Sequence, residues 1–257
     1  MAALMQNGVS QAVDVLVYND KLLLGVSAAA EGGGHIRQAI DAQGEANVVL
    51  ATGASQFEML GCSGPRGDRL VARNRVPSDE YVGLPASHLA SFRKYLRERL
   101  LAQLPVKPRF VEVNGDALDP LAETARLGAL IEQHPIDVCF AGIGENGHLA
   151  FNDPPADFET EQPYLIVSLD DACRRQQLGE GWFDSFEAVP RQAISMGIKQ
   201  ILKSRQIVLS VPDARKAEAV AASVEGPVTP MCPASILQRH PRATLHLDLA
   251  SSAGLRR

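Results

Sequence analysis

The chain is poor in aromatic residues, has few cysteines and contains no long apolar run. Only 5% of its 257 residues are aromatic, whereas 46% are hydrophobic, so Ala and the aliphatic residues must supply most of the core. This balance is common where parallel strands alternate with helices and rarer in all-β sandwiches. The composition therefore favours an α/β fold, and the length suits one continuous core.

The cysteines are too few and too widely spaced to indicate a metal site or a redox pair. They stand at positions 62, 139, 173 and 232, with no pair at metal-ligand spacing. We therefore predict no metal and expect reduced thiols, as in the cytosol.

Charge and hydropathy argue against nucleic acid and membrane as partners. The net charge is −5 and the pI about 5.7, and Lys and Arg are scattered along the chain. No broad phosphate-binding surface is therefore expected. The first ten residues lack a basic segment followed by an apolar run, and no run of about 18 apolar residues occurs. We expect a cytoplasmic protein without a membrane span.

Short apolar runs alternate with segments of helical spacing. Strands are predicted to begin at Val13, Ala46, Arg69, Arg109, Ile136, Tyr164, Gln206 and Ala243. Helices are predicted at 28–41, 87–104, 117–133, 191–203, 213–224 and 233–240. This pattern predicts a single domain, 1–257, with a mainly parallel sheet covered by helices on both faces. Ligands of such sheets bind beyond the carboxyl ends of the strands.

Within this domain we interpret residues 152–187 as a candidate lid. The segment begins with a polar, proline-rich stretch from Asn152 to Pro163.

Two strand-to-helix turns could hold an anion. Gly53-Ala54-Ser55 follows the strand at Ala46, and backbone N–H groups of such a turn can approach a phosphate. The second turn follows the strand at Gln206, and Asp213 is predicted to cap the helix that begins there. Arg215 and Lys216 fall in the first turn of that helix, where exposed cations oppose the helix dipole. A bound phosphate would remove that conflict. A tight connection and two solvated side chains are the competing interpretations.

The loop from Gly142 to Gly147 matches Gly-x-Gly-x-x-Gly, and Asp170 and Asp171 end a later strand where a ribose-binding acid could stand. A dinucleotide site, however, needs a helix directly after the last glycine. Only six residues separate Gly147 from the prolines at 154 and 155, which leaves no room for one.

The same loop could carry acid/base chemistry. It places His148, Asn152 and Asp153 within six positions, and histidine exchanges protons near neutral pH when a neighbour fixes its tautomer. A lone histidine is more often structural, but the glycines and polar neighbours favour function. Asp79 and Glu80 allow two interpretations: a cap with a solvent-facing charge, or a base that removes a proton beside a carbonyl.

Four collinear segments together resemble the glucosamine-6-phosphate deaminase family, within the wider group that includes 6-phosphogluconolactonases. The resemblance spans most of the chain, and its carriers are residues 79–84 (DEYVGL), 142–154 (GIGENGHLAFNDP), 216–227 (Lys-Ala through Val-Glu-Gly-Pro) and 232–235 (CPAS). It implies a Rossmann-like three-layer αβα sandwich. The implied reaction converts an amino-sugar 6-phosphate into a ketose 6-phosphate and ammonia without metal or organic cofactor.

The resemblance also assigns roles to residues. Asp79 matches the base that moves the C2 proton to C1, and His148 matches the base that helps to open the sugar ring. Asp153 stands where glutamate is usual, which shortens the side chain by one methylene. Asn146 replaces the usual aspartate partner of the histidine, so ring opening is expected to depend more on Asp153 or Glu145.

The phosphate-binding positions of the family map onto the turn at 53–55 and onto Lys216. The turn Gly53, Ala54, Ser55 departs from the usual Gly-Gly-Thr-Pro or Gly-Gly-Ser-Pro but retains a hydroxyl. An arginine after the lid also contacts phosphate in the family. Arg174 and Arg175 are rivals for that position, and we favour Arg174.

Two other functions compete with the deaminase. A sugar-phosphate lactonase needs activated water but no carbon base, and the segments at 79–84 and 151–154 are closer to the deaminase branch. A non-enzymatic sugar-phosphate-binding regulator is suggested by Asn146 but is opposed by the presence of Asp79 and His148. No linear motif fixes the sugar epimer, or decides whether the chain forms a homo-oligomer.

Overall fold

The computed structural model describes residues 3–4, 13–61, 74–104 and 107–256. Its main sheet has eight strands, of which β1 alone is antiparallel to its neighbour. In spatial order they are β1 (Ala3–Leu4), β2 (Val13–Tyr18), β11 (Ala243–Asp248), β10 (Gln206–Val211), β7 (Val138–Ala141), β3 (Asn47–Leu50), β4 (Asn74–Pro77) and β6 (Arg109–Phe110). The prediction of a mainly parallel sheet is confirmed. The beginning of the strand predicted from Arg69 lies outside the described residues.

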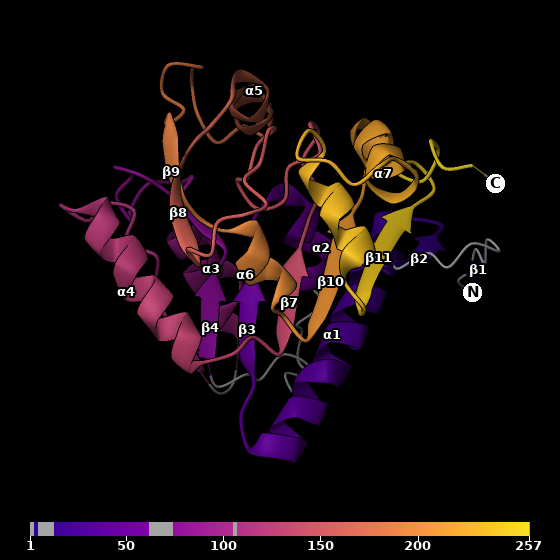
Figure 1. Ribbon diagram of the computed structural model, residues 1–257, viewed down its shortest axis with the longest axis horizontal. Coiled ribbons are helices and arrows are strands. Elements are labelled where there is room, and N and C mark those ends of the chain that lie inside the picture. Colours follow the sequence, from indigo (N-terminus) through magenta and orange to yellow (C-terminus); the bar gives the residue numbers. More distant parts are fainter. Residues whose placement is uncertain (1–2, 5–12, 62–73, 105–106, 257) are drawn as a thin grey trace.

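Helices cover both faces of this sheet (Figure 1). One layer holds α1 (Lys21–Gln43), α2 (Phe57–Gly61) and α3 (Phe92–Arg99); the other holds α4 (Pro120–Gln133), α6 (Ile198–Leu202), α7 (Ala217–Glu225) and the 3-10 helix η4 (Pro233–Arg239). Successive strand residues point to opposite layers: Val138 and Phe140 pack against α1–α3, whereas Cys139 and Ala141 pack against the other set. The three-layer αβα architecture is confirmed.

A second, smaller sheet lies beyond the carboxyl ends of the main strands. It is antiparallel, in the order β5 (Asp79–Tyr81), β9 (Gln192–Met196), β8 (Tyr164–Ser168), and α5 (Asp171–Gly179) follows β8. Figure 1 shows β8, β9 and α5 above the main sheet. A third apolar cluster, which includes Tyr81, Phe151 and Ala193, joins this layer to the rest.

This small sheet corrects three sequence predictions. The helix predicted at 191–203 is β9 followed by α6, because residues 193–196 are a fully buried run too short for periodicity to separate strand from helix. Asp79 and Glu80 are not a cap with a solvent-facing charge, because both are buried in a strand, β5. The strand at Tyr164 pairs antiparallel with β9 and does not join the main sheet.

The remaining helical predictions hold with shifted ends. The helix expected from Ala28 begins at Lys21, because the Asp20 side chain caps it by accepting the Leu23 N–H at 2.9 Å. The helix expected at 87–104 is α3 plus the 3-10 helix η2 (Leu101–Gln103), and the one at 213–224 is η3 (Ala214–Lys216) plus α7. A further short helix, η1 (Ala54–Gln56), precedes α2.

The candidate lid, 152–187, contains β8 and α5. Its first residue is anchored: Asn152 is buried, and its Nδ2 donates to the carbonyls of Leu149 and Met196, each at 2.8 Å. Movement of the rest stays a prediction.

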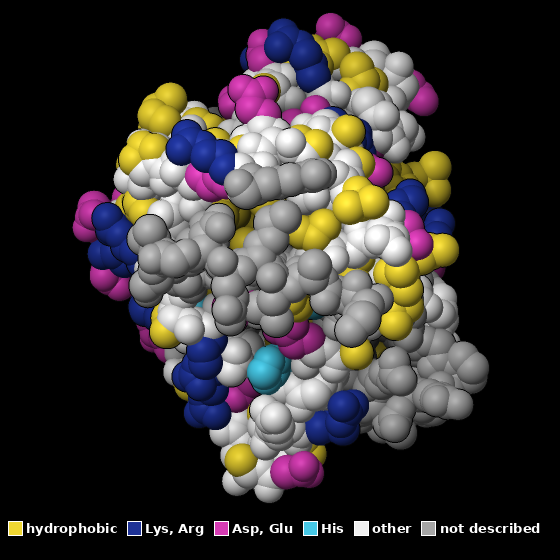
Figure 2. All heavy atoms as spheres, turned by 90° about the vertical axis from the view of Figure 1, so that its right-hand side faces the viewer, with side chains coloured by type: hydrophobic (Ala, Val, Ile, Leu, Met, Phe, Trp, Pro, Cys, Tyr) yellow, Lys and Arg dark blue, Asp and Glu magenta, His cyan; other side chains and the backbone are white. Residues whose placement is uncertain are grey.

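The surface carries no single dominant charge on the face in Figure 2, where Lys and Arg side chains lie apart, among acidic and apolar ones. Among the described residues, no helix combines the length and apolarity needed to cross a membrane.

Candidate active site

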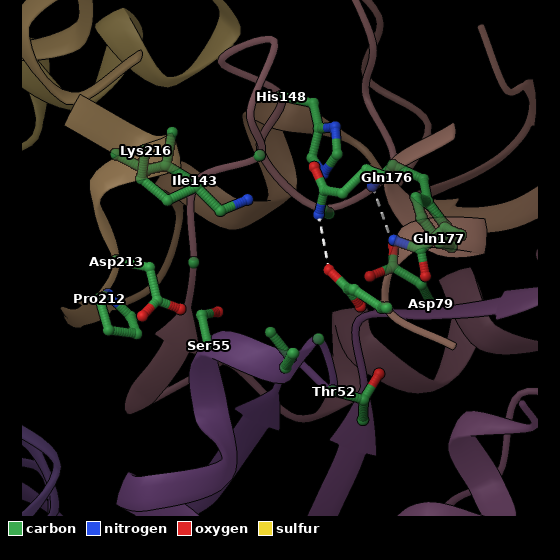
Figure 3. Close-up of a pocket in the computed structure, with 18 of the residues that line it drawn as sticks. Thr52, Ser55, Asp79, Ile143, His148, Gln176, Gln177, Pro212, Asp213 and Lys216 are labelled. Atoms are coloured by element: carbon green, nitrogen blue, oxygen red, sulfur yellow. Dashed lines mark hydrogen bonds between the residues drawn. The ribbon is translucent and has the colours of Figure 1, made fainter. Parts of the chain in front are cut away.

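One pocket collects most of the predicted site residues at the carboxyl ends of three adjacent strands, β10, β7 and β3. The loops after these strands supply Ser55, Gly144 and Lys216, the small sheet supplies Asp79, and α5 supplies Gln176. Figure 3 shows Asp79, His148, Gln176 and Lys216 around the same cavity. This is the position expected for a ligand site in an open parallel sheet.

Asp79 is a buried carboxylate whose hydrogen-bond donors are neutral. The Ser78 and Ser195 hydroxyls donate to it at 2.6 Å each, and the Phe151 N–H donates at 3.3 Å; the side chain is only 5% exposed. Burial raises the pKa of Asp79, although these hydrogen bonds and the nearby His148 oppose the rise. Such a carboxylate is a stronger base than an exposed one, which suits proton abstraction.

His148 and Asp153 form a buried acid/base pair. His148 Nδ1 lies 3.1 Å from Asp153 Oδ1, but the approach is not aligned as a hydrogen bond. Burial raises the pKa of Asp153, yet the contacts with His148 and Asn146 outweigh burial and hold that pKa below its usual value. Asp153 is therefore placed to stabilise a protonated imidazole.

Asn146 connects the members of this pair instead of orienting the ring directly. Its Nδ2 donates to Asp153 Oδ1 at 3.0 Å, and its Oδ1 accepts the backbone N–H of His148 at 3.1 Å. The carboxylate next to the imidazole is thus that of Asp153, as expected from the replacement of aspartate by Asn146.

The backbone between Gly142 and Asn152 folds back on itself to present His148. Gly147 has φ = 83°, which favours glycine, and the Gly144 N–H donates to the His148 carbonyl at 2.9 Å. A side chain at Gly144 would overlap the imidazole ring. Residues 142–164 contain no helix, which confirms that this Gly-x-Gly-x-x-Gly segment is not a dinucleotide fingerprint.

Glu145 lies at the surface and is not among the residues that line the pocket. It is exposed, and its carboxylate forms an ion pair with Arg215 at 3.2 Å, while its N–H donates to the Gln176 side chain at 3.0 Å. Of the two acids that could assist His148, the geometry therefore favours Asp153.

Opposite this acid/base group, the pocket has features suited to an anion. Gly53, Ala54 and Ser55 line it together with Lys216, which is only 4% exposed. No carboxylate in the described part of the chain lies within ion-pair distance of the Lys216 amine. Burial lowers the pKa of Lys216 to about 8. Asp213 stands at the predicted N-cap position, before η3, but it has φ = 81° and its side chain makes no capping hydrogen bond.

The structure does not bring Arg174 into this pocket. Its Nη2 donates to the carbonyls of Phe186 and Val189 at 2.7 and 3.1 Å, and its guanidinium stacks on the Phe186 ring. Arg175 is exposed and forms an ion pair with Asp171. Arg174 thus binds the loop that contains Phe186 and Val189, here called the 180s loop. Other side chains of α5 face the cavity.

Those other side chains were missed by the sequence reasoning. Gln176 and Gln177 line the pocket from α5, Glu180 lines it from the C-cap of that helix, and Thr52 lines it from the loop after β3. Gln177 accepts a 2.7 Å hydrogen bond from Tyr81, and Glu180 accepts one at 2.9 Å from Gln176. The spacing 176, 177, 180 marks one face of a helix, but no helix was predicted there, so this signal was not used.

One group of described residues has the ligand types of a metal site: His148, Asp153 and Cys173. Cys173, which is 1% exposed, adds a thiol to the acid/base pair of His148 and Asp153.

Comparison with known proteins places the chain in a family. A family model described as glucosamine-6-phosphate isomerases/6-phosphogluconolactonase matches residues 20–246. A glucosamine-6-phosphate deaminase from Oenococcus oeni is 36% identical over 228 residues, 89% of this chain and 94% of that protein. One from Streptococcus sanguinis is 39% identical over 207 residues, 80% and 86% of the two chains.

Solved structures agree. A monomeric glucosamine-6-phosphate deaminase superposes with a TM-score of 0.83 at 29% identity, covering 93% of this chain and 99% of that one. The 6-phosphogluconolactonase of Trypanosoma brucei has a TM-score of 0.76 at 15% identity, over 94% and 98% of the two chains, which shows a shared fold. The matched span and these relatives together show that the chain belongs to the glucosamine-6-phosphate isomerase/6-phosphogluconolactonase family.

Proposed function

We propose that the protein is a glucosamine-6-phosphate deaminase, which converts glucosamine 6-phosphate and water into fructose 6-phosphate and ammonia. The observation that carries the proposal is the pairing, across one pocket, of a buried carboxylate base with a buried lysine that has no ion-pair partner among the described residues. Deaminase relatives at 36–39% identity support it. Because a phosphorylated sugar does not leave the cell by diffusion, we place the reaction in the cytoplasm.

The first chemical step in this proposal opens the sugar ring. His148 removes the proton of the anomeric hydroxyl and returns a proton to the ring oxygen, and the nearby Asp153 carboxylate stabilises the imidazolium that forms between the two transfers. Asn146 holds Asp153 in place through its 3.0 Å hydrogen bond.

The second step moves a proton between carbons. Asp79 removes the proton from C2 of the open-chain sugar, and the C1 carbonyl oxygen takes up a proton to give an enolamine. Asp79 then delivers its proton to C1 while the amine nitrogen loses a proton, so that C2 carries an imine and C1 a hydroxyl. Water then adds to C2 and ammonia leaves. The Ser78 and Ser195 hydroxyls stabilise the Asp79 carboxylate before the transfer, while burial favours its protonated form during the transfer.

Substrate is held by its phosphate at the other side of the pocket. We propose that the backbone of Gly53 and Ala54, the Ser55 hydroxyl and the Lys216 ammonium bind this group. A phosphate dianion next to Lys216 would favour the ammonium form and offset the effect of burial on its pKa.

The proposal is tested by supplying the purified protein with glucosamine 6-phosphate and 6-phosphogluconolactone in separate assays. We expect ammonia and fructose 6-phosphate in equal amounts from the first, and no acceleration of lactone hydrolysis in the second. Rapid lactone hydrolysis without deamination would make the protein a lactonase. Tight binding of the sugar phosphate without turnover would make it a binding protein.

A further inference from the structure

The reaction proposed above makes no use of the Cys173 thiol, which lies close to the acid/base pair of His148 and Asp153. Cys173 is 1% exposed and lies on α5, with its Sγ within 4.8 Å of ligand atoms of His148 and Asp153. We propose that these three side chains bind a thiophilic divalent cation, Zn²⁺ in the first place, and that the bound ion inhibits the enzyme by occupying the ring-opening base.

The histidine nitrogen is available for this ligand. His148 Nδ1 is buried, and it makes no aligned hydrogen bond, although Asp153 Oδ1 is only 3.1 Å away. A buried nitrogen without a partner is costly, and either a proton or a metal ion would relieve that cost. Asp153 is held from its other side by the Asp170 N–H at 2.9 Å, which leaves Oδ1 directed at the imidazole.

The spacing of the three ligands fits a small tetrahedral ion after a modest adjustment. Zn–N and Zn–S bonds of about 2.1 and 2.3 Å place neighbouring ligand atoms about 3.5 Å apart. The largest separation here, within 4.8 Å, must shrink by about 1 Å. Three protein ligands leave a fourth position for water or a substrate oxygen, and His148 lines the substrate pocket.

The charges and protons also balance. One neutral imidazole, one carboxylate and one thiolate neutralise a divalent ion, and the thiol proton passes to solvent as the S–metal bond forms. Affinity for the ion is therefore expected to rise with pH.

Direct binding tests the site without depending on the proposed reaction. The metal-free full-length protein is titrated with Co²⁺, and thiolate-to-cobalt charge-transfer absorption is recorded for wild type, Cys173→Ser and a control, Cys232→Ser. We expect the band in wild type and in the control, and its loss in Cys173→Ser with affinity falling more than about 100-fold, since even outer-shell partners contribute about 10–100-fold. No band in wild type, or an unchanged band in Cys173→Ser, would overturn the proposal.

The inhibitory part rests on the proposed deaminase activity. Zn²⁺ should abolish turnover of wild type reversibly, a chelator should restore it, and the half-inhibitory concentration should rise more than about 100-fold in Cys173→Ser. Without metal this variant should turn over within about twofold of wild type, and Cys173→Ala serves if serine disturbs the packing. Equal inhibition of wild type and variant contradicts the inference, whereas absence of any turnover with the cobalt band intact contradicts only the proposed function.

Discussion

Two charge clusters lie on either side of β5 and differ in how their charges are matched. The structural cluster consists of Glu80, Arg93 and Asp116. The Glu80 carboxylate accepts the Arg93 Nε–H at 3.2 Å, the same guanidinium donates to Asp116 at 2.9 Å, and the N-terminus of α3 supplies further donors to Glu80. Every charge in this cluster has an opposite charge beside it.

The pocket cluster consists of Asp79, His148 and Lys216. These residues are buried, as Glu80 and Arg93 are, but their charges are incompletely matched. The donors to Asp79 are neutral, His148 Nδ1 lacks an aligned partner, and Lys216 has no ion-pair partner among the described residues. Burial raises the pKa of both Asp79 and Glu80. Burial and a shifted pKa therefore do not by themselves mark the catalytic group; an incompletely matched charge facing a cavity does.

The largest effect is expected from Asp79→Asn. The amide keeps the shape but cannot accept the C2 proton, so kcat for ammonia release should fall about 10³-fold. Substrate binding, measured by calorimetry, should stay within a few-fold of wild type. A variant that retains kcat would show that another group moves the proton.

The adjacent change Glu80→Gln should have the opposite profile. It leaves Arg93 partly uncompensated in the core, and stability to urea should fall by about 3 kcal/mol, judged from other buried ion pairs. The kcat per folded molecule should stay within about twofold. A large loss of kcat in the folded fraction would remove the distinction between the two clusters.

Asp153→Asn tests whether the imidazole depends on this carboxylate. The change removes the carboxylate that lies 3.1 Å from His148 Nδ1, and kcat should fall about 100-fold while thermal stability changes little. The double variant Asp153→Asn with Asn146→Asp returns a carboxylate to the loop and should recover part of the loss. Activity of the single variant close to wild type would argue for Glu145 instead.

Lys216→Met should weaken substrate binding more than chemistry. Loss of a charge-assisted hydrogen bond of about 1.5–3 kcal/mol predicts a KM about 10–100-fold higher. In wild type the free enzyme loses the ammonium as pH rises through about 8, so kcat/KM should decline above that pH. Lys216→Arg should lack this decline. A pH profile that is the same in wild type and Lys216→Arg would show that the Lys216 ammonium does not bind the phosphate.

The smallest effect is expected from Ser195→Ala. The Ser195 hydroxyl donates to Asp79 at 2.6 Å and favours the ionised carboxylate, so its removal should raise the pKa of Asp79 further. The base then becomes protonated at a higher pH, and the acid limb of kcat/KM should move upward. Ser91→Ala, which removes a 2.8 Å donor to Glu80, is the matched control and should leave that limb in place.

Much of the fold could be predicted from the sequence because its strands are local apolar runs. β2 and β10 begin at the predicted residues, Val13 and Gln206. β5 and β9 were not, because three residues that include two acids do not resemble a strand, and a fully buried run such as Ala193–Met196 has no alternation. Only the antiparallel pairing between these strands identifies them.

The site residues also divide into those that a local sequence pattern reveals and those that only the tertiary structure brings into the pocket. The His148 loop was found because glycines and polar side chains are close in sequence, whereas Gln176 and Glu180 enter the pocket only through the placement of α5 over the main sheet. Arg174 was predicted to contact phosphate only because of its position in the family resemblance. Its commitment to the Phe186 and Val189 carbonyls depends on how the 180s loop folds, which no local pattern reveals.

The most direct test of the account compares wild type, Asp79→Asn and Glu80→Gln with glucosamine 6-phosphate, measuring ammonia and fructose 6-phosphate in the same reaction. The account predicts equal amounts of both products from wild type and from folded Glu80→Gln, and about 10³-fold slower formation by Asp79→Asn. It is contradicted if wild type forms neither product, or if the two variants lose activity equally.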